Sequence, residues 1–133
     1  MRSIMVVIVL LSALFTSPAG AEGWQRGARP EPLIKQGAQR LSTTEVRSMI
    51  VGKTETWGSD NSGRQAGYYA PDGMLSYKYQ GKRITEKYSI SGNGTVCFKS
   101  GGCHYYLRYQ GKVVVVWNGK TRGTKSYRSG NRL

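Results

Sequence analysis

TVCFKSGGCHYY, residues 95–106, is the stretch of sequence that decides the fold of this chain. It predicts two short strands joined by a polar, glycine-rich loop, with one cysteine on each side of the loop. These are the only two cysteines among the 133 residues, and His104 is the only histidine. The strand-like segments on either side of this stretch can be laid out as hairpins around it.

Six other segments are predicted strands, from period-two alternation or, at residues 113–117, from a continuous apolar run. They are residues 53–57, 64–70, 74–80, 83–90, 113–117 and 120–128. Short turn sequences separate them, of which Asn118-Gly119 is typical of a type I′ hairpin. The segment 113–117, VVVVW, is the most hydrophobic, and we expect it to be buried on both faces.

One short helix is predicted ahead of the strands, at about residues 42–51. Ser42 and Glu45 have the spacing of a capping box, in which the serine caps the first turn. Val46 and Ile50 belong to a single apolar stripe at helical spacing. A helix with one narrow apolar stripe must lie against another element, such as a barrel mouth or a sheet face.

These elements predict a mainly all-β fold of about eight short strands. Because the connections are hairpin-sized, consecutive strands pair antiparallel in a meander, and eight strands are enough to close an up-and-down β-barrel. The alternative is an open, strongly curved meander sheet with the N-terminal helix across its concave face.

The beginning of the chain has the features of a secretory signal peptide, residues 1–21. A basic Arg2 precedes an apolar run at residues 4–15, and an A-x-A cleavage site ends at Ala21. The alternative is an N-terminal anchor that is not cleaved. We expect the protein to be periplasmic or secreted after cleavage, with no transmembrane segment in the mature chain.

The mature chain is predicted to hold one domain. Residues 22–40 are rich in Gly, Pro, Arg and Gln and are expected to be a flexible basic arm. The β-barrel-like domain covers residues 41–129, and residues 130–133 are a tail. Export favours a disulfide between Cys97 and Cys103. A redox pair or metal site is the alternative, but the spacing does not fit and no second Cys/His pair exists, so we expect no metal and no cofactor.

Positive charge is the strongest signal in the composition. The sequence has 20 Lys and Arg against 7 Asp and Glu, a net charge of +13. Such a field favours polyanions such as nucleic acid, lipopolysaccharide, phospholipid headgroups or glycans. The alternative is a basic surface with no specific partner. Four cations of the last predicted strand are candidates for an anionic-surface site: Lys120, Arg122, Lys125 and Arg128.

Several motifs together resemble a family of small exported proteobacterial proteins known only as a domain of unknown function. They are YYAPDG at residues 68–73, GTVC at residues 94–97, Cys103 and a closing Gly130-Asn131. The resemblance covers roughly residues 41–131, but this chain has Glu86 and Tyr88 where the family often has Gly and Trp. It implies a periplasmic, β-rich, lipocalin-like fold and no known activity.

Three residues are candidates for catalysis if the protein is an enzyme. Glu86 has the parity of the inner face of its strand, and His104 shares a face with Arg108. Together they have the composition of a small secreted ribonuclease site, with an acid, a base and a phosphate-binding arginine. The alternatives are a structural ion pair for Glu86 and a surface position for the lone histidine.

Aromatic residues interleaved with cations favour a binding role, although tyrosines also fill half-buried strand positions. The candidate ligand-binding residues are Tyr77, Tyr79, Glu86, Tyr88, Tyr106 and Arg108. We expect a non-enzymatic periplasmic binding or envelope-associated protein whose partner is an anionic envelope component or a small ligand. A small basic nuclease acting on RNA is the alternative, and an exported enzyme inhibitor is a further one.

Overall fold

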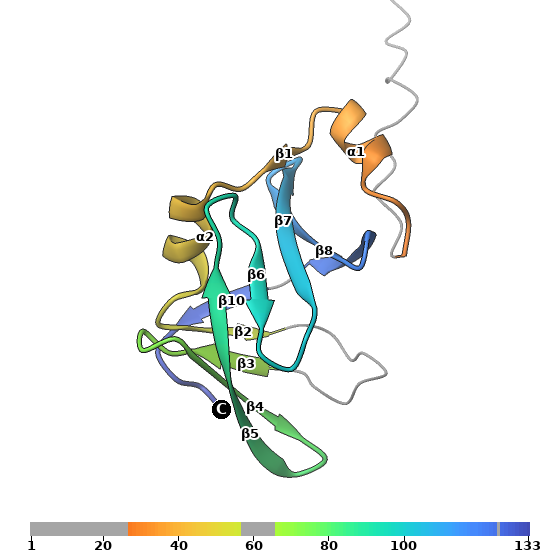
Figure 1. Cartoon of the computed structure of the whole chain (residues 1–133). Coiled ribbons are helices and arrows are strands. Elements are labelled where there is room, and N and C mark those ends of the chain that lie inside the picture. The colour runs from red at the N-terminus through yellow and green to blue at the C-terminus, as the bar shows by residue number, and fades with distance from the viewer. Residues whose placement is uncertain (1–26, 57–65, 125) are drawn as a thin grey trace, which may run out of the picture.

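The computed structural model describes residues 27–56, 66–124 and 126–133 (Figure 1). Over these residues it contains ten strands and two helices. The expected signal peptide and the first residues of the expected arm lie outside the described residues. The elements are α1 (Glu31–Lys35), β1 (Gln39–Arg40), α2 (Thr43–Ile50), β2 (Lys53–Thr56), β3 (Ala66–Tyr69), β4 (Met74–Tyr79), β5 (Lys82–Ile90), β6 (Val96–Phe98), β7 (Cys103–Tyr109), β8 (Lys112–Trp117), β9 (Lys120–Thr124) and β10 (Ser126–Ser129).

The strands form one curled antiparallel sheet in the order β10-β2-β3-β4-β5-β6-β7-β8-β9. This confirms the predicted mainly β fold built on a strongly curved meander. β5 is the longest strand: its first part pairs with β4, and its last three residues pair with β6. One long strand that serves two parts of a sheet in this way lets the sheet curl around a core.

The predicted strand 120–128 is wrong as a single element, because it forms two strands with different partners. β9 pairs with β8 at one end of the sheet order, whereas β10 pairs with β2 at the other end. Only Lys125 separates the two strands in the sequence. One straight strand cannot reach both ends of the sheet, so the segment breaks where the curled sheet returns toward its own beginning.

The predicted helix is confirmed as α2, which lies along one side of the curled sheet (Figure 1). Ser42 is its N-cap and accepts a hydrogen bond from the Glu45 backbone N–H at 3.2 Å. Val46 and Ile50 are fully buried in the main core, which is formed by the inward side chains of the sheet. Burial of these two side chains contributes about 2 kcal/mol each to holding the helix in place.

Residues 27–40 do not form the flexible arm that the sequence suggested. They contain α1 and β1, and β1 pairs with β7 in the same sheet, beyond the residues of β7 that pair with β6. Leu33 and Ala38 pack there against Leu107, Val114 and Val116, forming a second apolar cluster. Because β8 carries valines on both faces, its outer face needs a cover, and the segment before α2 supplies it.

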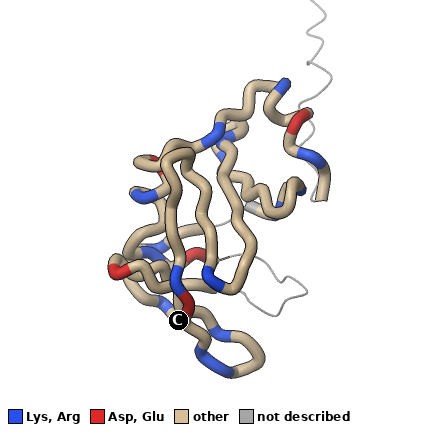
Figure 2. Tube along the Cα trace, in the orientation of Figure 1, with Lys and Arg blue, Asp and Glu red and all other residues tan. Residues whose placement is uncertain are grey.

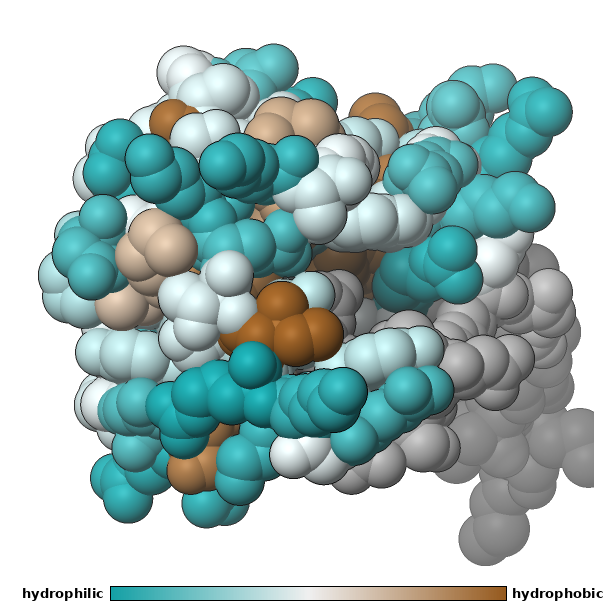
Figure 3. Space-filling view, turned by 60° about the horizontal axis from the view of Figure 1, so that its bottom comes forward, coloured by the Kyte–Doolittle hydropathy of each residue, from teal (hydrophilic) through white to brown (hydrophobic). Residues whose placement is uncertain are grey.

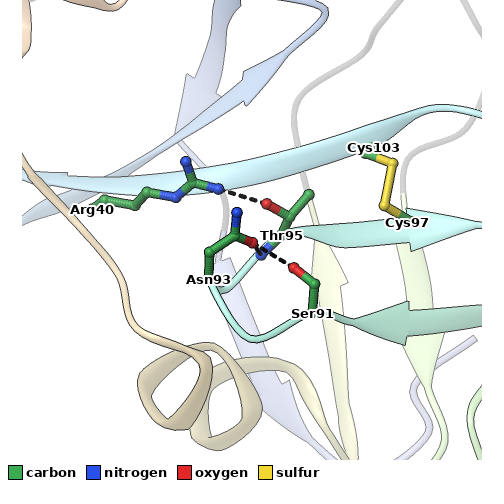
Figure 4. Close-up of a disulfide and its surroundings, with 6 residues drawn as sticks. All are labelled: Arg40, Ser91, Asn93, Thr95, Cys97 and Cys103. Atoms are coloured by element: carbon green, nitrogen blue, oxygen red, sulfur yellow. Dashed lines mark hydrogen bonds between the residues drawn. A yellow bond between two sulfur atoms is a disulfide. The ribbon is translucent and has the colours of Figure 1, made fainter.

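The cysteine stretch forms β6, a loop and β7, as predicted. Cys97 and Cys103 lie directly opposite each other on the two strands and are joined by a disulfide, with 4.1 Å between their Cα atoms (Figure 4). At the other end of β6, the Arg40 guanidinium donates a hydrogen bond to Thr95 Oγ1 at 2.5 Å. Arg40 also lies over the ring of Tyr105, 4.1 Å from its centroid. These contacts fasten β1 to β7 and to the residue that precedes β6.

Candidate functional site

Four cations lie on the outward face of β4, β5 and the end of β6. On β5 the exposed residues alternate with half-buried ones from Arg83 to Ile90, so the exposed ones share the outward face. We call the surface formed by Lys78, Arg83, Lys87 and Lys99 the basic face; all four side chains are exposed. Figure 2 shows Lys and Arg positions at the end of the molecule that holds the β4–β5 hairpin, and others along the rest of the trace.

The cations of the basic face form two pairs of like charge. Lys78 and Arg83 are directly opposite each other on β4 and β5. Lys99, the residue directly after β6, is opposite Lys87 on β5, because the Lys99 N–H donates to the Lys87 carbonyl oxygen at 3.0 Å and continues the register of the two strands. Arg83 and Lys87 are four positions apart on an extended strand, so the two pairs are about 13 Å apart.

Only hydroxyl groups lie between the two cation pairs on this face. The side chains of Ser76 and Thr85 are hydrogen-bonded across β4 and β5 at 3.2 Å. Glu86, the nearest acid in sequence, has the opposite parity, and its carboxylate accepts a hydrogen bond from the Ser100 backbone N–H at 3.2 Å. The positive charge of the basic face is therefore not neutralised by an acid on β5.

Like charges placed opposite each other across a sheet destabilise it. Cations also protect the edges of sheets against pairing with other chains. Edge protection accounts for Arg83, because the first part of β5 has β4 on one side only. It does not account for Lys78 opposite Arg83, nor for Lys87, which has a neighbour on both sides. The two opposed pairs are what a site for anionic groups needs, because each pair can surround one anion.

The surface of the molecule around the β4–β5 hairpin is polar. Figure 3 shows it covered mainly by hydrophilic side chains, with apolar ones as separate spots rather than one continuous patch. A partner that binds here is recognised by charge and hydrogen bonds more than by burial of apolar area.

The three residues considered for catalysis are not brought together. The Arg108 guanidinium forms an exposed salt bridge with Glu45 at 2.9 Å. Glu86 accepts from the loop before Cys103, whereas His104 is buried and bonds to Tyr106. His104 and Arg108 do share a face of β7 by parity, as expected, but Arg108 is exposed at the far end of that face, where its side chain reaches Glu45 on α2. The three side chains therefore bond to different partners: Arg108 to Glu45, Glu86 to Ser100 and His104 to Tyr106.

The other candidate ligand-binding residues divide between the core and the surface. Tyr106 is fully buried, and Tyr77 and Tyr88 are half-buried against the main core. The Tyr88 hydroxyl donates to the Ala70 carbonyl oxygen at 2.7 Å. Tyr79 alone among these tyrosines is a large exposed side chain, 37% exposed at the end of β4.

The candidates on the last predicted strand are separated by the break in that strand. Lys120 is exposed and Arg122 is half-buried on β9, whereas Arg128 is exposed on β10. β9 and β10 pair with different strands, so these cations do not form one row. Lys125 lies outside the described residues.

A buried polar cluster in the core was not predicted. Glu55 on β2 is 1% exposed, and its carboxylate accepts a hydrogen bond from the Tyr106 hydroxyl at 3.1 Å. The same hydroxyl is 2.7 Å from Nε2 of His104, which is 3% exposed. With its proton donated to Glu55, the Tyr106 oxygen accepts from an Nε2–H of His104. The cluster therefore links β2 to β7 across the inside of the curled sheet.

Tyr127 completes the surroundings of Glu55. It lies directly opposite Glu55 on β10, and its hydroxyl is buried without a hydrogen-bond partner of normal geometry. Burial raises the pKa of the Tyr127 hydroxyl, and the nearby Glu55 carboxylate raises it further. The pKa of Tyr106 is raised by the same two causes, burial first. Aromatic rings of Phe98 and Trp117 pack on His104 at centroid distances of 5.3 and 5.6 Å.

The described residues hold no group of three or more side chains of the types that bind metals. No helix in the described ranges is long and apolar enough to cross a membrane. Comparison of the chain with protein-family models, with curated proteins and with solved structures finds no match. The function must therefore be inferred from the charges and contacts of the chain itself.

Proposed function

We propose that the protein is an exported binding protein that attaches to a polyanionic partner through the basic face. The observation that carries this proposal is the two pairs of opposed like charges, Lys78 with Arg83 and Lys87 with Lys99. An anionic group between the members of each pair relieves the repulsion that the free protein carries. The attraction of the cations for the anion and the loss of their mutual repulsion then both stabilise the complex.

The expected strength is moderate. A Lys or Arg near an anionic surface contributes about 1 kcal/mol at physiological ionic strength. Four such cations give about 4 kcal/mol, which is roughly a thousandfold in affinity. Binding of this kind weakens steeply as salt concentration rises.

Export is part of this proposal. Residues 1–21 act as a signal peptide that is cleaved after Ala21, and the mature protein works in the periplasm or outside the cell. The Cys97–Cys103 disulfide supports this location, because such bonds persist in oxidising compartments. The partner is then an anionic component of the cell envelope.

The test compares two variants of the oxidised protein from Glu22 onward that lose the same number of positive charges. The first replaces the four basic-face residues by Gln, and the control replaces four exposed cations elsewhere: Lys35, Lys112, Lys120 and Arg128. Affinity for inorganic polyphosphate is measured at low and high salt. We expect the basic-face variant to lose at least about a hundredfold in affinity and the control much less. Equal losses would show that net charge alone attracts the polyanion, and would contradict the proposal.

A further inference from the structure

The end of the β4–β5 hairpin differs from the rest of the basic face. Gln80 and Gly81 connect the strands with φ angles of 49° and 75°, which suits a two-residue type I′ turn. Lys78 and Tyr79 lie beyond the residues of β4 that pair with β3. On the other side of the hairpin, β6 pairs only with residues 88–90 of β5, which are far from the turn. Figure 1 shows this hairpin projecting from the curled sheet. We call residues 78–83 the hairpin tip.

The hairpin tip presents cations on both of its faces. Lys78 and Arg83 point outward, whereas Lys82 lies directly opposite Tyr79 and has the parity of the other face. All three cations are exposed, and residues 73–85 contain no acid. A single polyanionic chain lying along the basic face contacts one side of the hairpin and leaves Lys82 and Tyr79 on the other. A layer of anionic headgroups surrounds the tip and contacts both sides.

Tyr79 is the residue that distinguishes a bilayer from a soluble polyanion. Its ring and the side chain of Ile34 on α1 are the two large apolar side chains found exposed in the described part of the chain. Tyrosine suits the membrane interface, because its ring is apolar and its hydroxyl remains hydrogen-bonded to water or headgroups. Cations that flank such a ring hold it against anionic lipid.

We propose that the hairpin tip anchors the protein to an anionic phospholipid bilayer, with Tyr79 inserted among the headgroups and Lys78, Lys82 and Arg83 bound to lipid phosphates. This inference rests on the proposed function, because Lys78 and Arg83 belong to both surfaces. The inference adds that the partner is a phospholipid bilayer and that Tyr79 is the residue inserted into it.

The first experiment measures co-sedimentation of the oxidised protein with vesicles of phosphatidylcholine, with or without phosphatidylglycerol. We expect binding only when phosphatidylglycerol is present. Tyr79→Ala should weaken it about tenfold, since the ring loses roughly 50 Å² of burial. Ile34→Ala is the matched control, because it removes the other exposed apolar side chain, and it should change binding less than twofold.

The second experiment reports insertion directly. Tryptophan emission is recorded for Tyr79→Trp and Ile34→Trp on vesicles whose lipid chains carry bromine, which quenches tryptophan at short range. We expect the signal added by Tyr79→Trp to be quenched and the signal added by Ile34→Trp to remain. Equal quenching of both variants would overturn the inference.

The outcomes separate this inference from the proposed function. Vesicle binding that depends on the four basic-face cations but not on Tyr79 would leave the proposed function standing and overturn the anchor. Binding to RNA or polyphosphate but not to vesicles would also overturn the anchor alone. Loss of the anchor and of all polyanion binding together would refute both.

Discussion

Lys99, the residue directly after β6, lies opposite Lys87 on β5, and the Lys99 N–H donates a hydrogen bond to the Lys87 carbonyl oxygen at 3.0 Å. Two exposed ammonium groups are thus held on the same face of neighbouring strands. Lys78 and Arg83 repeat the arrangement on β4 and β5. In both pairs the hydrogen-bonded backbone holds two cations side by side, and this is the basis of the binding function that we propose.

The first prediction concerns the cost of this arrangement to stability. Lys99→Thr should raise the free energy of unfolding by about 0.5 kcal/mol at low salt, because it removes a like-charge pair from the sheet. Lys112→Thr is the control, since Lys112 faces Tyr109 across β7 and β8 rather than another cation. Urea unfolding measures both. The difference should vanish at high salt, and a persistent difference would show that repulsion is not its cause.

The same Lys99→Thr protein should bind polyanions more weakly than the Lys112→Thr protein. A stabilising substitution that weakens binding is expected where charges are placed for a partner. An unchanged affinity for polyanions would show that Lys99 does not belong to the binding site.

The second prediction concerns the buried cluster. Tyr106→Phe removes the hydroxyl that lies between Glu55 and His104, and should lower the free energy of unfolding by about 1–3 kcal/mol. The neighbouring substitution Tyr105→Phe should cost less than about 0.5 kcal/mol, because Tyr105 is only half-buried and faces outward against Arg40. Thermal or urea unfolding distinguishes the two. Similar losses would mean that the hydroxyl does not link the strands energetically.

The third prediction follows from the raised pKa values of Tyr106 and Tyr127. Above the ordinary tyrosine pKa of 10.0, the unfolded chain releases protons that the folded protein keeps. The free energy of unfolding is therefore fully maintained below pH 10 and falls above it, by about 1.4 kcal/mol per pH unit for each of these tyrosines.

Tyr127→Phe should reduce this alkaline slope and leave stability near neutral pH almost unchanged, because the hydroxyl lacks a hydrogen-bond partner of normal geometry. Comparing the variant with the parent protein removes the contribution of the lysines, which titrate in the same range. Identical slopes above pH 10 would show that Tyr127 ionises in the folded protein as freely as in the unfolded one.

The fourth prediction concerns the two adjacent glycines of the cysteine loop. Both have a positive φ, 102° for Gly101 and 87° for Gly102. A Cβ at Gly101 meets no atom within 4 Å, whereas one at Gly102 lies 2.7 Å from Cζ2 of Trp117. Gly101→Ala should therefore cost about 1 kcal/mol from backbone strain. Gly102→Ala should cost about 1–3 kcal/mol more, because the Trp117 ring must move. Equal effects on urea unfolding would contradict this account of the loop.

Much of the fold followed from local sequence. The turn residues and period-two alternation predicted nearly every strand, and the Ser42 cap predicted the helix. The break between β9 and β10 was not predictable in the same way, because it depends on the sheet curling back toward β2. Residues 27–40 were misjudged for a related reason: α1 is only five residues long, and its place is set by the outer valines of β8.

The candidate site was only partly predictable. The period-two alternation along residues 83–90 is enough to place Arg83 and Lys87 on one face of β5. Their opposition to Lys78 and Lys99 depends on strand register, which the turn at Gln80-Gly81 sets on one side and the disulfide loop on the other. Glu55 was missed because its strand, KTET, has no apolar residue that signals an inward face. Its burial depends on Tyr106 and Tyr127, which come from the far end of the chain.

The measurement that tests the central claim most directly is a nuclear magnetic resonance titration of the isotope-labelled, oxidised protein with inorganic polyphosphate. Amide shifts locate the bound anion without any substitution. We predict that the largest changes fall on residues 76–87 and on Lys99, with small changes on β9, β10 and α1. Changes spread evenly over all exposed lysines and arginines, or centred on Lys120, Arg122 and Arg128, would contradict a binding site on the basic face.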